Sequence, residues 1–352
     1  MTTFNKIYRA SRVWVLILLA ALVPVMINNK YFLNLACLGM MYAMLTISLN
    51  ILSGFSGLMS VGHIAFFGLG AYTTAILTTT YHMPILVGFL AAGIVAAFFS
   101  LLLGLPTMRL QGTYFCVATL AFGTVVYQVL KNWESLTNGT KGILGIPAIE
   151  IFGISFKNYK AYYYLMLVAL ILSVIIAMNL LHSRPGRAIL AIRESDIAAE
   201  AMGINVVNYK IIAFMTSAFI AGIAGAFYAH FIRYISPEPF AQAESNTLLS
   251  MMVIGGIGSI PGAILGGIAL TILPEVLRFI GDFRLVLYGA AVVAIIIFAP
   301  GGLGGFIEKW DRHLCGYDKL AAARKAEMDA EIRAEIEASL HEEGAHQDVS
   351  NT

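Results

Sequence analysis

Long runs of apolar residues, separated by short polar segments, dominate this chain. No Asp, Glu, Lys or Arg occurs from Tyr31 through Met108, and residues 161–181 and 211–229 are also free of these charges. About 20 apolar helical residues cross the roughly 30 Å hydrocarbon core of a bilayer. The pattern therefore predicts an all-α, polytopic transmembrane helical bundle of about ten spans, at residues 13–27, 32–52, 62–80, 84–103, 113–130, 161–181, 211–229, 247–259, 262–278 and 285–300.

A polar island, residues 186–203 (GRAILAIRESDIAAEAMG), lies between two of these apolar runs. It has helix-forming composition, charges of both signs and a cluster of small residues at 198–201. This order predicts a helix that docks a soluble partner. The alternative is a solvated amphipathic helix lying on the lipid surface.

The basic residues next to the spans predict the orientation. Lys6, Arg9 and Arg12 precede the first span and place the N-terminus in the cytoplasm. That span resembles a signal peptide, but no clean cleavage site follows it, so we expect an uncleaved first span. Counting ten spans places the island and the C-terminal tail in the cytoplasm and residues 131–160 outside, although four lysines in that loop oppose this placement. We expect a transmembrane domain at 1–307, with its cytoplasmic loop at 184–210, and a charged cytoplasmic tail at 308–352 that is helical or partly disordered.

Composition supports a membrane protein. Hydrophobic residues make up 59% of the 352 and charged residues 12%, with a mean hydropathy of +0.80, whereas soluble domains carry about 25% charged residues. The formal charge of +2 conceals an asymmetry, because the tail from Glu308 holds 11 acidic and 6 basic residues. The remainder is basic, as expected for a chain oriented by cytoplasmic Lys and Arg.

Two glycine-rich segments are predicted to be broken helices. Residues 53–70 hold five glycines, and residues 248–267 hold six together with Pro261. Irregular backbone at membrane depth is tolerated where it is buried in protein or lines a cavity. Close helix packing through small residues at 258, 262 and 266, and at 221, 225 and 229, is the alternative reading. The candidates for a substrate pathway are Ser60, Gly62, His63, Gly255, Gly256 and Gly258.

Motifs for catalysis are missing from the sequence. There is no G-x-x-x-x-G-K-[ST] phosphate loop, no G-x-S-x-G elbow and no cluster with metal-ligand spacing. Glu275 is the one acidic residue inside a predicted span, and His63 stands alone among apolar residues, where hydrogen bonding to a neighbouring helix competes with substrate binding. These features disfavour a membrane enzyme and an ion-driven carrier, and they predict no metal and no cofactor in this chain.

Six stretches in order resemble the branched-chain amino-acid permeases of ATP-binding cassette importers, and the LivM type fits better than the LivH type. The island is similar to their G-R-x-x-x-A-I-R-E-x-x-x-A-A-E-x-x-G-I pattern, although its Glu-Ala-Met-Gly is a shortened form of the E-A-A-x3-G loop of importer permeases. Residues 318–352 lie outside the resemblance. The other stretches are SGFSGLMSVGHIAFFGLGAYTTAIL (53–77), GTYFCVATLAFG (112–123), TNGTKGILGIP (137–147), MMVIGGIGSIPGAILGG (251–267) and APGGL (299–303).

The resemblance implies a non-enzymatic permease subunit in a cell inner membrane. Its expected partners are a related LivH-type permease, two cytoplasmic ATPases that use ATP, and an extracytoplasmic binding protein that delivers branched-chain or other apolar amino acids. Urea or short amides are the alternative cargo, and an autonomous secondary carrier or channel is the alternative class. The residues expected to couple to the ATPases are Arg193, Glu194, Ala199, Glu200, Ala201 and Gly203.

Overall fold

The computed structural model describes residues 29–108, 113–151 and 154–277, together with Pro24, 289–290, 292–293, 297 and 302–305. The described helices belong to one compact unit, Ala10–Gly305. The tail 308–352 lies outside the described residues, as does the predicted span 13–27 apart from Pro24. Of the predicted span 285–300, residues 289–290, 292–293 and 297 are described.

Five helices in the described part of the chain are long and apolar enough to cross a membrane. They correspond to the predicted spans 32–52, 84–103, 113–130, 161–181 and 211–229, so the helical membrane architecture is confirmed at this level. Their bounds are α2 (Lys30–Leu49), which continues as the π-helix η1 (Asn50–Phe55), α4 (Ile85–Thr107), α5 (Thr113–Asn132), α7 (Tyr159–His182) and α10 (Val206–Ile232).

Three further helices are shorter than a simple span. They are α3 (Ile64–Thr79), α11 (Gln242–Gly255) and α12 (Ile260–Val276), and two of them, α3 and α12, are apolar. The three helices correspond to the predicted spans 62–80, 247–259 and 262–278, and the count of ten spans stays a prediction. Because α11 begins at Gln242, it includes Glu244, so Glu275 is not the one carboxylate inside this bundle.

Polar side chains mark where many of these helices begin. Asn158 caps α7 and Asn205 caps α10, each accepting a hydrogen bond from a backbone amide of the first turn. Ser259 caps α12 in the same way, and Pro261 occupies its first turn, where no amide hydrogen is needed. Local sequence therefore sets these helix starts.

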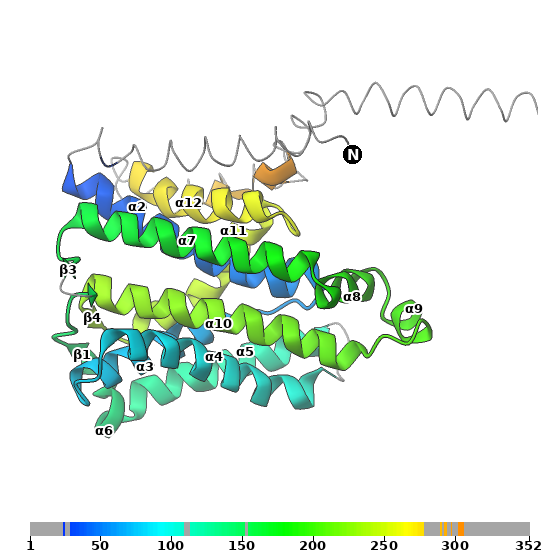
Figure 1. Ribbon diagram of the computed structural model, residues 1–352, viewed down its shortest axis with the longest axis horizontal. Helices are drawn as coiled ribbons and strands as arrows, with labels where there is room; N and C mark the ends of the chain where they lie inside the picture. Colours follow the sequence, from blue (N-terminus) through cyan, green and yellow to red (C-terminus); the bar gives the residue numbers. More distant parts are fainter. Residues whose placement is uncertain are drawn as a thin grey trace, which may run out of the picture. The chain divides into compact units, whose positions relative to one another are not determined.

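Helix α10 lies at the centre of the bundle. It packs against α3 and α4, while α2 packs against α12, α7 and α10 (Figure 1). Glycines allow this contact to be close: a Cβ built at Gly225 would lie 2.1 Å from the carbonyl oxygen of Phe67, and one built at Gly222 would lie 2.5 Å from that of Ala92. Small-residue packing, predicted at position 225, is confirmed.

The two ends of the bundle differ. One end carries the predicted outside loop, which is not purely helical: it holds α6 (Glu134–Thr137), the 3-10 turn η2 (Gly139–Lys141), β1 (Ile143–Leu144), β2 (Glu150–Ile151) and β3 (Ile154–Ser155). Strand β1 pairs antiparallel with β4 (Tyr234–Ile235), β2 pairs with β3, and η3 (Glu238–Phe240) leads into α11. The opposite end carries α8 (Arg184–Glu194) and α9 (Asp196–Ala201), as Figure 1 shows.

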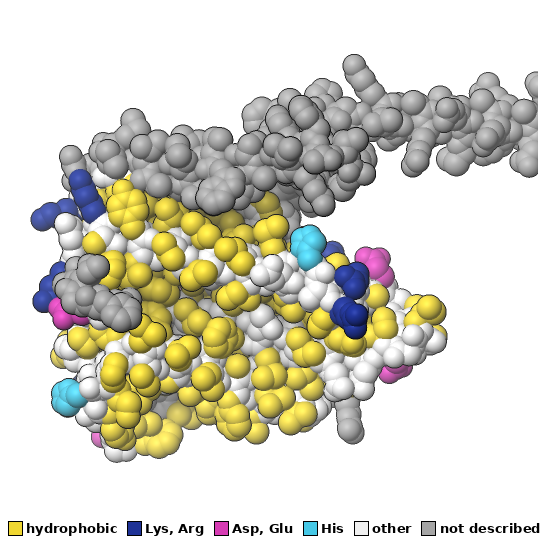
Figure 2. Space-filling model, in the orientation of Figure 1, with side chains coloured by type: hydrophobic (Ala, Val, Ile, Leu, Met, Phe, Trp, Pro, Cys, Tyr) yellow, Lys and Arg dark blue, Asp and Glu magenta, His cyan; other side chains and the backbone are white. Residues whose placement is uncertain are grey.

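The face in Figure 2 carries hydrophobic side chains across its middle, whereas its charged side chains gather at the two ends. This distribution matches a hydrocarbon layer between two aqueous phases.

Candidate functional site

Two interruptions of helical structure form the centre of the candidate site. The first break, residues 56–63, separates η1 from α3, and the second break, residues 256–259, separates α11 from α12. Gly57, Gly256 and Gly258 have positive φ values of +74°, +116° and +81°, where a residue with a Cβ would be strained. The broken helices predicted from the glycine-rich segments are confirmed.

The side chain of Asn50, the first residue of η1, connects η1 to the second break. Its Oδ1 accepts a hydrogen bond from the Gly258 amide at 2.8 Å, and its Nδ2 donates to the Ser259 carbonyl at 2.9 Å. Asn50 is fully buried. The one side-chain amide of Asn50 therefore provides hydrogen-bond partners for the Gly258 N–H and the Ser259 carbonyl, which lie outside a helix.

The substrate-pathway candidates Ser60, Gly62 and His63 lie in the first break and are held by several elements. His63 Nε2 lies 2.9 Å from Ser48 Oγ and 3.4 Å from Ser217 Oγ. Gly62 lies against α5, since a Cβ there would lie 1.8 Å from the Thr119 carbonyl oxygen. Packing against α5 and hydrogen bonds to neighbouring helices therefore explain the positions of Gly62 and His63 in the first break.

Some polar atoms of the first break are buried without a partner. Within the described part of the chain, Ser60 Oγ and His63 Nδ1 have no hydrogen-bond partner, and neither has Gln242 Oε1. The Gln242 Nε2 donates to the Val61 carbonyl at 2.9 Å. Buried polar groups normally find partners, so this region has unused hydrogen-bonding capacity.

The glycines of the second glycine-rich segment, residues 248–267, differ in their surroundings. Gly255 is buried, and a Cβ there would lie 2.4 Å from the Gly262 carbonyl oxygen. Gly255 is therefore a packing position, whereas the sequence led us to expect that its backbone is exposed to substrate. Gly256 is also buried. Gly258 lies in the break and not on one helical face with Gly262, because the helix is not continuous there. Gly262 and Gly266 do pack against α11, as predicted.

The polar island forms two helices instead of one. Ser195 ends α8 and caps α9 by accepting a hydrogen bond from the Ala198 amide at 3.2 Å. A left-handed turn at Gly203 ends α9, with φ of +80° and hydrogen bonds from Gly203 N to the Glu200 carbonyl and from Ile204 N to the Ala199 carbonyl. Lys210, buried at the start of α10, pairs with Asp196 at 2.6 Å and ties α9 to α10.

The structure separates the expected coupling residues into two groups. Ala199 is buried with Ile192 and Val206, whereas Arg193, Glu194, Glu200, Ala201 and Gly203 are exposed. Arg193 is directed back to the helix breaks: a Cβ built at Gly258 would lie 2.8 Å from Arg193 Nη1. The α9 end also exposes two large apolar side chains, Ile197 at 82% and Met202 at 83%.

The exposed faces of the long helices are not alike. Between Leu86 and Leu105, every exposed residue of α4 is apolar. The exposed face of α5 includes Thr124 and Gln128, and that of the neighbouring α11 includes Asn246. Because lipid tails offer no hydrogen bonds, the α4 face suits lipid and the α5–α11 face suits water or another protein.

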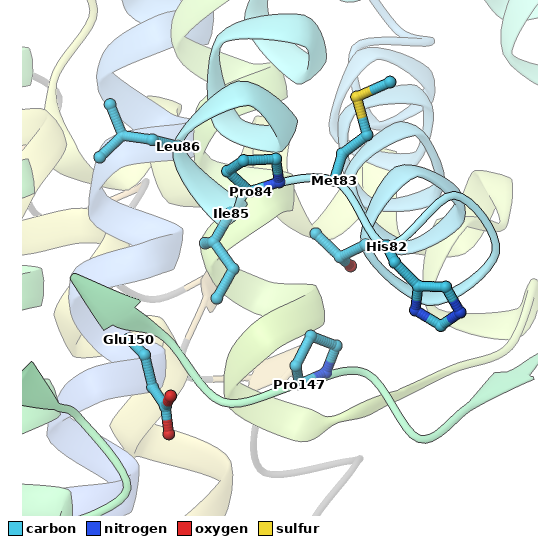
Figure 3. Close-up of a pocket in the computed structure, with 8 residues that line it drawn as sticks. His82, Met83, Pro84, Ile85, Leu86, Pro147 and Glu150 are labelled. Carbon is cyan, nitrogen blue, oxygen red and sulfur yellow. The ribbon is translucent and has the colours of Figure 1, made fainter. Parts of the chain in front are cut away.

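A cavity of about 460 Å³ lies at the end of the bundle opposite α8 and α9. It is formed where the α3–α4 connection, with His82 and Pro84, faces Pro147 and Glu150 (Figure 3). None of the site residues predicted from the sequence lines it. Near the same end, the Ser236 hydroxyl donates to Glu238 and lowers the pKa of that carboxyl below its usual value, which keeps it ionised.

Sequence reasoning missed Asn50, Gln242 and Ser217. Asn50 could have been recognised from the sequence, because its amide side chain stands in an otherwise apolar run directly before a glycine-rich segment. Gln242 precedes the predicted span at 247, and Ser217 lies inside a long apolar helix. Neither has a local sequence pattern that marks it.

Comparison with known proteins decides the family. Residues 31–299 match the family of the branched-chain amino acid transport system / permease component. The chain belongs to this family. The high-affinity branched-chain amino acid transport system permease protein LivM of Escherichia coli (strain K12) is 35% identical over 311 residues, which cover 82% of this chain and 73% of that protein.

More distant relatives belong to the same transport systems. LivH of Escherichia coli (strain K12) is 25% identical over 301 residues, covering 78% of this chain and 96% of LivH. BraD of Pseudomonas aeruginosa is 26% identical over 296 residues, covering 78% of this chain and 95% of BraD. These relatives are transport permease proteins and not enzymes. No solved structure matches the chain.

Proposed function

We propose that this chain is the membrane-spanning permease subunit of an ATP-driven importer for branched-chain or other apolar amino acids. It lies in the cytoplasmic membrane, with about ten spans and both termini in the cytoplasm. It works with a related permease, two cytoplasmic ATPases that use ATP and an extracytoplasmic binding protein. Membership in the permease family carries this proposal, and the projecting α8–α9 pair supports the role of the ATPases.

The end formed by α9 serves as the ATPase dock. It offers two exposed apolar side chains, Ile197 and Met202, beside the carboxylate of Glu200. The capped turn at Gly203 and the Lys210–Asp196 pair hold this helix in place. Binding energy at interfaces concentrates in a few large, desolvated side chains, so a small, rigid apolar tip can dock in a groove.

The α5–α11 face lines the substrate pathway opposite the related permease. Thr124 and Gln128 are hydrogen-bonded within α5, to the Leu120 carbonyl and the Asn132 amide. As exposed polar side chains, these residues and Asn246 still suit water better than lipid. The neighbouring Gln242 and the first break add unpaired polar atoms, and the positive ends of the helices that start there favour a carboxylate. Glu244 and Lys131 are the charged residues of α11 and α5, so the rest of this face is uncharged and suits zwitterions with apolar side chains.

Cysteine labelling tests this pathway. In the assembled transporter, Asn246→Cys is expected to react with a membrane-impermeant thiol reagent during turnover, because its surface faces water. Ile94→Cys on α4, exposed at 60% in the free subunit, is the matched control and stays unreactive because it faces lipid. Equal reactivity at the two positions would contradict the assignment of the α5–α11 face.

The cargo is tested by ATP hydrolysis in the reconstituted complex. Binding protein loaded with leucine, isoleucine or valine is expected to stimulate hydrolysis, while urea is expected to give no stimulation. Stimulation by urea and not by these amino acids would contradict the proposed substrate class.

A further inference from the structure

We propose that Arg193 is a positioning residue that links movement of α8 to both helix breaks. The inference rests on the proposed function, in which an ATPase moves α8 and α9. It adds a route from that movement to the backbone of the bundle.

Helix α8 presents one face to the two breaks. Ile189, which is 1% exposed, packs in a cluster with Phe55, Ala213 and Ile260. Phe55 ends η1 before the first break, and Ile260 begins α12 after the second. Arg193 follows Ile189 by four residues and therefore lies on the same face of α8, one turn further along.

Arg193 lies beside a glycine of each break. A Cβ built at Gly57 would lie 3.7 Å from Arg193 Cγ and 3.8 Å from its Cα, so the start of the side chain lies near Gly57 in the first break. A Cβ built at Gly258 would lie 2.8 Å from Arg193 Nη1, so the guanidinium lies directly on the backbone of the second break. Any side chain at position 258 would displace it.

Gly258 is held from two sides. Arg193 contacts it from α8, while Asn50 accepts the hydrogen bond of its amide from within the bundle. Gly54 leaves room for this approach, because a Cβ there would lie 2.7 Å from the Gly258 nitrogen. The contacts run from α8 through the Arg193 side chain and Gly258 to Asn50 of η1, which gives a displacement of α8 a route to the helix breaks.

The side chain must be an arginine for this role. Its planar guanidinium can cover backbone while its long stem packs along the first break, whereas lysine offers a compact, strongly hydrated ammonium. The charge also suits the carbonyl groups at the C-terminal end of α11, which is the negative end of that helix. Arg193 is therefore assigned to the helix breaks, which it borders while its side chain is also exposed at the surface.

The test uses the complete transporter in proteoliposomes, with amino-acid uptake and ATP hydrolysis measured together. Arg193→Ala is expected to lower uptake per ATP hydrolysed by about tenfold, within the usual range of coupling between sites, while the ATPase subunits co-purify normally. Arg193→Lys is expected to recover part of the loss. Arg187→Ala is the matched control, because Arg187 is on the same helix and its side chain bonds only the His182 carbonyl among described residues, so it should couple normally.

Two outcomes would overturn the proposal that Arg193 links α8 to the helix breaks. Normal uptake per ATP in Arg193→Ala would show that the contact transmits nothing. Loss of the ATPases from the Arg193→Ala complex would place Arg193 in the docking surface instead. The variant Glu200→Lys tests the proposed function separately. If it does not reduce co-purification of the ATPases, docking at α9 is contradicted, and the Arg193 contacts are unaffected by that result.

Discussion

Replacing Ile197 by Asp is expected to remove the ATPases from the purified transporter while leaving this subunit folded. Ile197 is 82% exposed at the tip of α9, and substitutions at exposed positions usually change folding stability by no more than about 0.5 kcal/mol. In a docked complex the same side chain is desolvated in an apolar groove. Loss of such an anchor costs about 2 kcal/mol or more, which is about 30-fold in affinity.

Co-purification of the ATPases with an affinity-tagged subunit measures this effect. Ile197→Leu is the matched control, because it keeps an apolar side chain of similar volume, and it should retain the ATPases. Met202→Asp should behave like Ile197→Asp, since Met202 is exposed to a similar extent. Full retention of the ATPases in both Asp variants would rule out the α9 tip as the dock.

Replacing Gly70 by Ala is expected to destabilise the bundle strongly. A Cβ at this position of α3 would lie 2.1 Å from the Gly222 carbonyl oxygen and 2.5 Å from the Gly222 Cα on α10. Both contacts are with backbone, which cannot rotate away, so the two helices must separate. Overpacking of this kind costs about 1–3 kcal/mol, occasionally more, and α10 also carries contacts to α4 and α2.

The thermal midpoint of the detergent-solubilised subunit should fall by several degrees in Gly70→Ala. The control is Gly39→Ala on α2, where the nearest atom to the new Cβ is 3.7 Å away, an ordinary contact. Its midpoint should stay close to that of the unchanged protein. Equal midpoints for the two variants would contradict the close α3–α10 packing.

The sequence predicts features that depend on local chemistry. Glycine density located both helix breaks, charge-free runs located the long helices, and the composition of the island predicted helical structure there. Each depends on residues within one or two turns of each other. Ser195 could also have indicated the division of the island, since serine is a common cap at the start of a helix.

Features that depend on contacts between distant segments could not be predicted in this way. Asn50 meets Gly258 across 208 positions, and nothing near either residue specifies the pairing. The direction of Arg193 depends on how α8 folds back on α7, where Gly186 lies against the Leu180 carbonyl. The contrast between Gly255, which packs on Gly262, and Gly258, which lies in the break, likewise follows from tertiary structure.

Amino-acid uptake into proteoliposomes tests the central claim most directly. The chain is reconstituted with its related permease, the two ATPases and the binding protein, and uptake of radiolabelled leucine is followed with and without ATP. The account predicts uptake only when ATP and the ATPases are both present, and its abolition by Ile197→Asp. Uptake by this chain alone, independent of ATP, would contradict the account and indicate an autonomous carrier.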